Sequence, residues 1–253
     1  MNSQIGNEIL ENSISIVYED EDVLAVNKPS GLMTHPDGRN ESRTLSDWAV
    51  EYSPEIRGVG EPLKLSNGSL IERHGIVHRL DRETSGIILL AKHQKAFEYL
   101  KIEFQERRIQ KTYYAFVHGI LPEPQGSITL PIGKSRSKFP LWSAERGARG
   151  MMRDAITAYR VIESSKEFSF VEVLPKTGRT HQIRVHFKAI QHPIVCDKLY
   201  APKRPCALGF KRLALHALSL EFTLPSGVRV KLETAPPSDF LKARALLASG
   251  QTV

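Results

Sequence analysis

Short apolar runs separated by turn-forming residues fill most of this chain, and they limit the folds that it can adopt. Nearly all of these runs are shorter than nine residues, which is the usual length of a strand rather than of a helix. The last two flank Pro225-Ser226-Gly227, a hairpin signal with glycine at the turn. Strands are predicted at residues 14–17, 23–26, 87–91, 113–119, 127–132, 155–162, 168–174, 213–224 and 228–232.

A few segments have the periodicity of helices instead. Within residues 93–108 the side chains of Phe97, Leu100 and Phe104 recur on one face, and Arg107 and Arg108 follow at the C-terminal end, where positive charge is favourable. Further helices are expected at residues 45–52 after Thr44, around residues 183–190, and from about residue 237 onward.

Predicted strands outnumber predicted helices, and many of them adjoin in the sequence. This order is typical of an α+β fold in which a large mixed, mainly antiparallel sheet carries helices packed against it. The chain has 253 residues, near the upper range of a single domain. We expect one domain at residues 14–248, preceded by a flexible N-terminus at residues 1–13.

The distribution of charge indicates a polyanionic partner. The formal net charge is +7, but the first 63 residues carry 12 acids and only 4 Lys or Arg, whereas the remainder carries 16 acids and 31 Lys or Arg. A basic body of this kind is typical of a surface that binds nucleic acid. The alternative is that scattered lysines merely aid solubility.

Cysteine usage and hydropathy bear on the compartment. Cys196 and Cys206 are the only cysteines, which argues against a disulfide scaffold and fits a reducing compartment. They have no partner cysteines for a zinc site. A signal peptide begins with a basic segment, but the first Lys or Arg of this chain is Lys28. No apolar run approaches the roughly 20 residues of a membrane span. These features predict a cytoplasmic protein without membrane association.

The sequence HRLDRETSG at residues 78–86 places one acid, Asp81, between Arg79 and Arg82. Nearby positive charge favours the ionised form of a carboxyl group. Such a group suits a nucleophile or an electrostatic stabiliser better than a general acid. On its own, however, an Arg–Asp pair on a loop is often structural.

The longer string HRLDRETSGIILLAK resembles the signature of the RluA-type pseudouridine synthases, in which the aspartate of HRLD is catalytic. Three more segments fit the same family in the same order: KPSGLMTHP at residues 28–36, KTYYAFVHG at residues 111–119, and TGRTHQIRVHF at residues 177–187 followed by HPIVCDKLY. The resemblance extends from about residue 16 to residue 232. It implies a catalytic domain with a mixed sheet and a central cleft flanked by helices, and it implies isomerisation of RNA uridines to pseudouridine without cofactor or metal.

The resemblance also assigns roles to individual residues. It implies that Asp81 is the catalytic carboxylate, that Arg184 pairs with it, and that Tyr113 stacks on the target base. The alternatives are a solvated helix arginine for Arg184 and a core tyrosine for Tyr113, with Tyr114 on the opposite face of the strand. A uridine in a stem must be flipped out of the stack, and Arg79 matches the family position proposed to fill the gap.

Basic and aromatic residues interleave in residues 134–153, a pattern that grips the backbone by charge and the bases by stacking. The alternative is a solvated loop whose aromatic side chains pack into the core. The predicted RNA-binding residues are His78, Arg79, Arg82, Lys134, Arg136, Lys138, Trp142, Arg146, Arg149 and Arg179. His78 is also expected to orient the Asp81 loop, whereas His181 and His186 are expected to hydrogen-bond rather than bind zinc.

Two departures from the family pattern qualify these expectations. Cys196 stands where the family usually has glycine before the aspartate, which puts the local backbone geometry in doubt. The chain resembles a short member without the N-terminal RNA-binding domain, so the catalytic domain itself should recognise a structured stem-loop of rRNA or tRNA. We expect a monomer with no obligate protein partner. The competing hypotheses are a catalytically idle RNA-binding or ribosome-assembly factor, and a metal-dependent RNA hydrolase.

Overall fold

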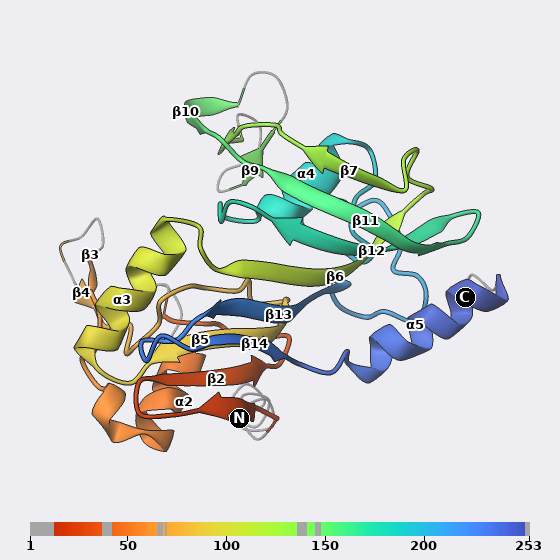
Figure 1. Cartoon of the computed structure of the whole chain (residues 1–253). Helices are drawn as coiled ribbons and strands as arrows, with labels where there is room; N and C mark the ends of the chain where they lie inside the picture. The colour runs from red at the N-terminus through yellow and green to blue at the C-terminus, as the bar shows by residue number, and fades with distance from the viewer. Residues whose placement is uncertain are drawn as a thin grey trace. The chain divides into compact units, whose positions relative to one another are not determined.

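The computed structural model describes residues 13–36, 42–64, 68, 70–135, 141–144 and 148–250. Its contacts divide the chain into two compact units (Figure 1). The first comprises Met1–Gln110 and Ser219–Thr234, and the second comprises Lys111–Leu218 and Ala235–Val253. Nearly all of the predicted flexible N-terminus lies outside the described residues, and the domain limits of 14 and 248 stay predictions.

Strands β2 and β5 of the first unit's sheet are buried on both faces. Val23 to Val26 and Ile87 to Ala91 are inaccessible to solvent, which explains why these two strands read as continuous apolar runs rather than as an alternating pattern. The pairs β1–β2, β2–β5 and β13–β14 are antiparallel. The order of neighbours is β1 (Ser15–Glu19), β2 (Val23–Lys28), β5 (Ser85–Ala91) and β13 (Leu215–Thr223), with β14 (Arg229–Glu233) also on β13.

Among the described residues, two α-helices belong to this unit. Helix α2 (Leu45–Tyr52) begins as predicted after Thr44, whose backbone N–H donates to Asp47 Oδ2 at 2.8 Å. Helix α3 (Gln94–Gln105) buries Phe97 and Leu100. The described residues between positions 53 and 73 include a 3₁₀ turn η1 (Pro54–Ile56) and the two-residue strands β3 (Leu63–Lys64) and β4 (Leu70–Ile71).

The predicted C-terminal end of α3 at Arg108 is wrong, because the helix stops at Gln105. Arg107 adopts a left-handed conformation (φ 61°), and the N–H of Arg108 donates to the carbonyl of Glu103 at 2.9 Å. This is a Schellman motif, which ends an α-helix at a residue in the left-handed conformation. The Arg108 guanidinium, which lies beyond the end of the helix, pairs with the buried carboxylate of Glu103 in its last turn at 3.1 Å.

The second unit contains an antiparallel sheet and a smaller one. Following β13, the larger sheet runs in the order β6 (Gln110–His118), β12 (Phe168–Pro175), β11 (Thr157–Ser164) and β7 (Gln125–Ile128). The smaller sheet has the order β10 (Arg149–Arg153), β8 (Ile132–Lys134) and β9 (Trp142–Ser143). The prediction of one strand over residues 127–132 is wrong, because its ends belong to different sheets. Pro131 lies at the break and lacks the N–H that a continuous strand would use.

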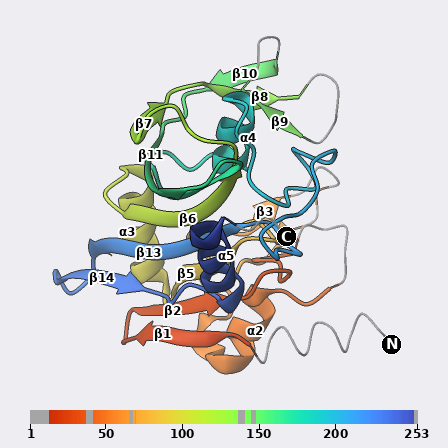
Figure 2. The same cartoon turned by 90° about the vertical axis from the view of Figure 1, so that its right-hand side faces the viewer.

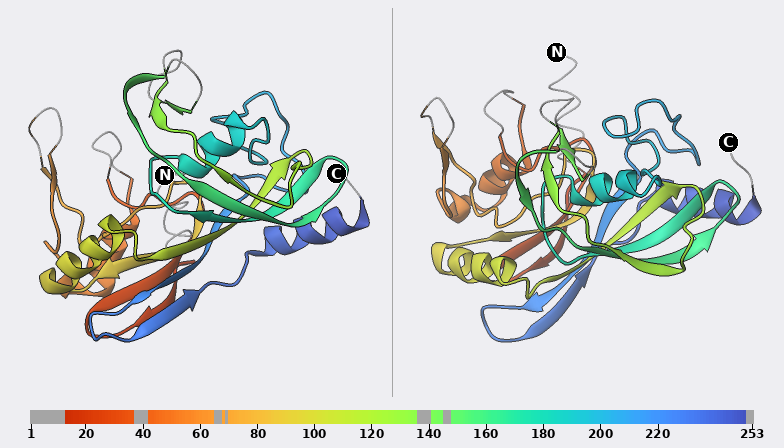
Figure 3. Two further views of the ribbon diagram at one scale, coloured as in Figure 1. Left: turned by 45° about the horizontal axis from the view of Figure 1, so that its top comes forward. Right: turned by 90° about the horizontal axis from the view of Figure 1, so that it is seen from above.

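Helices α4 (Gln182–Ala189) and α5 (Ser238–Ser249) cover opposite faces of the larger sheet. Phe187 of α4 packs near Tyr159, which pairs with Val173 of β12. Arg244 of α5 lies over Phe170, three residues before Val173 and therefore on the other face. In Figure 2 the strands curve around α4, and in Figure 3 α5 lies on the far side of the strands.

The α+β class with a large, mainly antiparallel sheet is therefore confirmed. The order of neighbours includes nine strands among the residues that the structure describes, and β13 contributes residues to both units. None of the described helices is both long and apolar enough to cross a bilayer. The central cleft stays a prediction.

Candidate active site

Asp81 lies on the loop that leads into β5. Its side chain is partly exposed, between the buried Leu80 and the exposed Arg82. The carbonyl of Asp81 accepts a hydrogen bond from the N–H of Thr84 at 3.1 Å, which closes a tight turn. The carboxylate is therefore presented from a short turn that ends at a fully buried strand.

Lys28, in the KPSG segment at the end of β2, hydrogen-bonds to the backbone of this turn. Its side chain is completely buried, and Nζ donates to the carbonyls of Pro29 (2.8 Å), Leu32 (2.8 Å) and Arg82 (3.2 Å). A buried charge is tolerated only when it is hydrogen-bonded in this way. These contacts give Lys28 a structural role beneath the Asp81 loop.

Other residues of the same segment fix the backbone on both sides of Asp81. Thr34 Oγ1 donates to the carbonyl of Leu80 at 2.9 Å and lies 3.3 Å from the Leu80 nitrogen. The N–H of Gly31 donates to the carbonyl of Arg82 at 2.8 Å. Arg82 Nε returns a hydrogen bond to the carbonyl of Gly31 at 2.9 Å. The segments KPSGLMTHP and HRLD, distant in sequence, thus form one hydrogen-bonded cradle.

His78 at the start of HRLD connects the loop to the sheet and to α3. Its Nε2 accepts the N–H of Leu89 in β5 at 2.9 Å, and its ring stacks on Phe104 with 4.5 Å between the centroids. These contacts support the prediction that His78 orients the loop. Its role in RNA binding stays a prediction, as does that of Arg79, whose side chain is exposed.

Arg184 lies on α4 in the second unit and is buried, so the alternative of a solvated surface arginine is wrong. Its Nε donates to Asp197 Oδ2 at 2.9 Å and its Nη2 to Asp197 Oδ1 at 2.8 Å. The guanidinium carbon is 5.0 Å from the centroid of the Tyr200 ring. The pairing of Arg184 with Asp81 stays a prediction, because the two residues belong to different units.

Asp197 was missed by the sequence reasoning. Its side chain is only 1% exposed, and a carboxylate is almost never fully buried unless it is paired. The signal lay in the segment HPIVCDKLY, where a single acid follows an apolar run within residues 192–200. The identity of its partner depends on the fold, because Arg184 lies 13 positions away.

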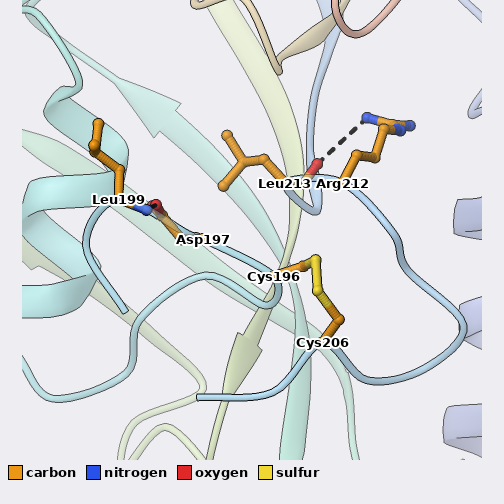
Figure 4. The surroundings of a disulfide bond; sticks show 6 residues. All are labelled: Cys196, Asp197, Leu199, Cys206, Arg212 and Leu213. Atoms are coloured by element: carbon orange, nitrogen blue, oxygen red, sulfur yellow. Dashed lines mark hydrogen bonds between the residues drawn. A yellow bond between two sulfur atoms is a disulfide. The ribbon is translucent and has the colours of Figure 1, made fainter. Parts of the chain in front are cut away.

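Cys196 precedes Asp197 and forms a disulfide with Cys206 (Figure 4). The expectation drawn from two sparse cysteines did not include this bond, because sequence separation does not show that their Cα atoms lie 4.3 Å apart. Cys196 is also left-handed, with φ at 58°. Glycine adopts that conformation without strain, which explains the family's usual glycine at this position.

Tyr113 and Tyr114 lie on β6 next to Val173 and Glu172 of β12, respectively. Both are partly buried and pack against the hydrophobic core of the second unit. The Tyr114 ring meets Phe170 edge to face with 5.0 Å between the centroids, so Tyr114 is a core tyrosine. The stacking role of Tyr113 stays a prediction.

The predicted RNA-binding residues of the second unit have different environments. Lys134 is exposed, whereas Trp142 is partly buried against the cluster of Ile132, Ala155, Val185 and Tyr200. Arg179 Nε donates to the carbonyl of Asp154 at 3.1 Å. Arg136, Lys138 and Arg146 lie outside the described residues, as does the side chain of Arg149.

His181 and His186 form hydrogen bonds, as predicted. His181 Nδ1 lies 2.8 Å from the Tyr200 hydroxyl. The ring of His186 lies between Thr157 Oγ1 (2.9 Å) and the carbonyl of Leu130 (2.8 Å). Burial lowers the pKa of His186 from its ordinary value. The neutral ring therefore serves as a packed hydrogen-bonding group of the core.

Comparisons with known proteins agree with the motifs. The model of the RNA pseudouridylate synthase family matches residues 22–189. The dual-specificity RNA pseudouridine synthase RluA of Vibrio cholerae is 39% identical over 84% of this chain and 78% of its own length. The ribosomal large subunit pseudouridine synthase D of Neisseria meningitidis serogroup B is 36% identical over 93% of this chain, which spans 61% of that relative.

A solved structure shares the fold. The human RNA pseudouridylate synthase domain-containing protein 1 superposes with a TM-score of 0.70 at 27% identity, over 90% of this chain and 85% of the other. The family match covers more than half of the sequence, and the motif residues Asp81 and Tyr113 and the whole of α4 with Arg184 fall within it. The chain therefore belongs to the RluA-type family of RNA pseudouridine synthases, isomerases that modify RNA.

Proposed function

We propose that this protein converts specific uridines of ribosomal or transfer RNA to pseudouridine, with Asp81 as the catalytic carboxylate. The observation that carries the proposal is the cradle around Asp81. Side chains and backbone of the KPSG segment hydrogen-bond to Leu80 and Arg82, the residues on either side of Asp81. A reacting group needs its backbone fixed in this way, because catalysis depends on placing it within a narrow range of geometry.

The reaction breaks the bond from the sugar carbon C1′ to N1 of uracil and forms a bond from C1′ to C5 of the same base. The hydrogen on C5 leaves as a proton and N1 gains a proton, so the product is an isomer of the substrate and no electrons are exchanged with an outside partner. In the proposal an ionised Asp81 acts as covalent partner or proton acceptor. Arg184 pairs with its carboxylate, and Tyr113 stacks on the base.

We propose that different residues flip the target base and bind the RNA backbone. A uridine within a stem must be flipped out at a cost of a few kcal/mol, and Arg79, which is exposed, would fill the vacated stack. Arg82, Lys134 and the other basic residues predicted from the sequence would contact phosphates of a stem-loop. We propose that the protein acts as a cytoplasmic monomer, although the disulfide does not support the cysteine-based argument for that compartment.

The relatives narrow the RNA classes to test. One is named for the large ribosomal subunit and another is named as dual-specific, so ribosomal RNA is a candidate substrate here and a second class of RNA is tested beside it. Pseudouridines are mapped in total cellular RNA as carbodiimide-dependent stops of reverse transcription. Cells lacking the gene are compared with cells restored by wild type, by Asp81→Ala, or by Glu83→Gln, an exposed acid in the same motif.

The proposal predicts a stop that vanishes on deletion and returns with wild type and Glu83→Gln but not with Asp81→Ala. The RNA that carries the stop names the substrate. If all stops persist, purified protein is incubated with total RNA from the deleted strain. Absence of new pseudouridine there as well would contradict the proposal and favour an idle RNA-binding factor.

A further inference from the structure

The carboxylate of Asp197 is saturated with donors although it is almost completely buried. Oδ1 accepts from Arg184 Nη2 at 2.8 Å and from the backbone N–H groups of Leu199 and Tyr200, each at 3.0 Å. Oδ2 accepts from Arg184 Nε at 2.9 Å. Three directions of hydrogen bonding therefore fix the plane of the carboxylate, and through it the plane of the guanidinium.

The turn that carries Asp197 is itself attached to the sheet. The N–H of Val195 donates to the carbonyl of Phe116 in β6 at 2.8 Å, and the N–H of Ala214 donates to the carbonyl of Val195 at 3.1 Å. Cys196, the residue directly before Asp197, is linked to Cys206 by a disulfide (Figure 4). These links restrain the backbone of Asp197, so the position of its carboxylate determines the orientation of the Arg184 guanidinium.

Tyr200 limits the remaining freedom of the guanidinium. Its ring lies 5.0 Å from the guanidinium carbon of Arg184, within range of a cation–π contact. Its hydroxyl oxygen accepts the N–H of Trp142 at 3.3 Å and lies 2.8 Å from His181 Nδ1. The backbone N–H of the same residue binds Asp197. Tyr200 therefore contacts both members of the pair, the guanidinium of Arg184 through its ring and the carboxylate of Asp197 through its backbone.

We propose that Asp197 is a positioning residue that directs Arg184 in catalysis, and this inference rests on the proposed role of Arg184. A buried ion pair adds little net stability compared with apolar residues of the same volume. What the bidentate pair supplies is direction: it occupies the Nε and Nη2 edge of the guanidinium. The remaining edge, which includes Nη1, then points in one direction only.

The test is the turnover of a short stem-loop RNA, identified by the mapping, with Asp197→Asn. Misplacing a reacting group by about 1 Å costs about 100-fold in rate, so we expect kcat to fall by about that factor while KM for the RNA is unchanged. The matched control is Asp239→Asn. Asp239 pairs with Arg212 in the same bidentate way, at 2.7 and 2.9 Å, elsewhere in the second unit. The control should keep the wild-type kcat.

A double-mutant cycle separates positioning from a purely structural role. If Asp197 acts through Arg184, the variant Asp197→Asn/Arg184→Met should be no slower than Arg184→Met alone. This double variant also removes both charges of the buried pair, so it should fold even if Asp197→Asn leaves an unpaired guanidinium. Losses in kcat that multiply across the cycle would overturn the inference.

The outcomes also distinguish this inference from the proposed function. If wild type forms no pseudouridine on any RNA, the proposed function fails. If wild type is active, Asp81→Asn is inactive and Asp197→Asn keeps wild-type kcat, only the positioning role fails. Should Asp197→Asn not fold, Asp197→Glu retains the charge but displaces the carboxylate by one methylene. A wild-type kcat for that variant would equally contradict the inference.

Discussion

The Asp81 loop and the Arg184–Asp197 pair are positioned by different means. The loop is fixed through its main chain, because polar groups of the KPSG segment bind the backbone of Leu80 and Arg82 while the Asp81 side chain remains partly exposed. Arg184 is fixed through its side chain, by a carboxylate buried with it. The first arrangement leaves a carboxylate accessible to a substrate, and the second gives a cation a fixed direction.

This difference determines which substitutions should damage each region. The Asp81 loop depends on donors from a segment that is remote in sequence, above all the buried ammonium of Lys28. The Arg184 region depends on the turn that carries Asp197 and on the disulfide beside it. Changes confined to one region should therefore lower stability or turnover through separate contacts.

Lys28→Met should have the largest effect, because it removes the ammonium that binds three carbonyls in the cradle. Buried carbonyls that lose a charged donor cost about 1.5 to 3 kcal/mol each. Relief from burying the charge offsets part of this, and the Arg82 carbonyl keeps the N–H of Gly31. We expect the free energy of unfolding to fall by about 3 kcal/mol, together with kcat, as measured by urea denaturation and turnover.

The control for this prediction is Lys101→Met, which removes a partly exposed lysine that pairs with the exposed Glu61. A surface ion pair of this kind contributes about 0.5 kcal/mol or less. The main-chain account of the loop would be contradicted if Lys28→Met unfolded at the same urea concentration as Lys101→Met.

Reduction of the disulfide should have an intermediate effect and act on the Asp197 side. The Cys196–Cys206 bond closes a short loop with a sequence separation of 10, and such a link stabilises the folded state by about 2 kcal/mol. We expect a dithiol reductant to lower the midpoint of thermal unfolding of wild type. Cys196→Ser/Cys206→Ser should start from a lower midpoint and show no response to the reductant. A wild-type midpoint that stays constant while two thiols become titratable would contradict the prediction.

Acid should produce the smallest effect and should again act on the second unit. Burial lowers the pKa of His118 to about 4, whereas an unfolded histidine has its ordinary pKa of about 6.5. The unfolded state therefore binds the proton more tightly. The stability contributed by neutral His118 is complete above pH 6.5 and is lost as the pH falls toward 4.

The measurement is the free energy of unfolding at pH 7 and pH 5.5. We expect a loss of about 1 kcal/mol for His118 over this range, and His118→Phe should remove that part of the slope. The variant suits the site, since the ring already lies 5.3 Å from that of Phe168 and its Nε2 has no hydrogen-bond partner in the described structure. His216, whose pKa is also lowered to about 4 by burial, should keep part of the slope. An unchanged slope in His118→Phe would contradict the assignment.

The elements of the fold were predictable where local signals agreed. The apolar runs at β2 and β5, the cap at Thr44 and the turn before β14 gave strands and a helix close to their observed limits. The errors have local causes that periodicity does not register. Pro131 divides a predicted strand between two sheets, and a left-handed Arg107 ends α3 early.

The candidate site was predictable only in part. Motif resemblance predicted roles for Asp81 and Arg184, which stay predictions, but neither the cradle of Lys28 and Thr34 nor the contact between Arg184 and Asp197 followed from it. Those contacts join residues 13 to 54 positions apart, and a single sequence carries no signal for such pairs. The disulfide was missed for the same reason, because the sequence does not show that Cys196 and Cys206 lie close together.

The most direct test of the central claim, that Asp81 is the catalytic carboxylate, follows the hydrogen on C5 of uracil. Substrate RNA is labelled with tritium at that carbon, and release into water is measured for purified wild type, Asp81→Asn and Glu83→Gln, with thermal unfolding as a check on folding. The account predicts release by wild type and Glu83→Gln and no release above background by a folded Asp81→Asn. Release by Asp81→Asn at the wild-type rate would contradict it.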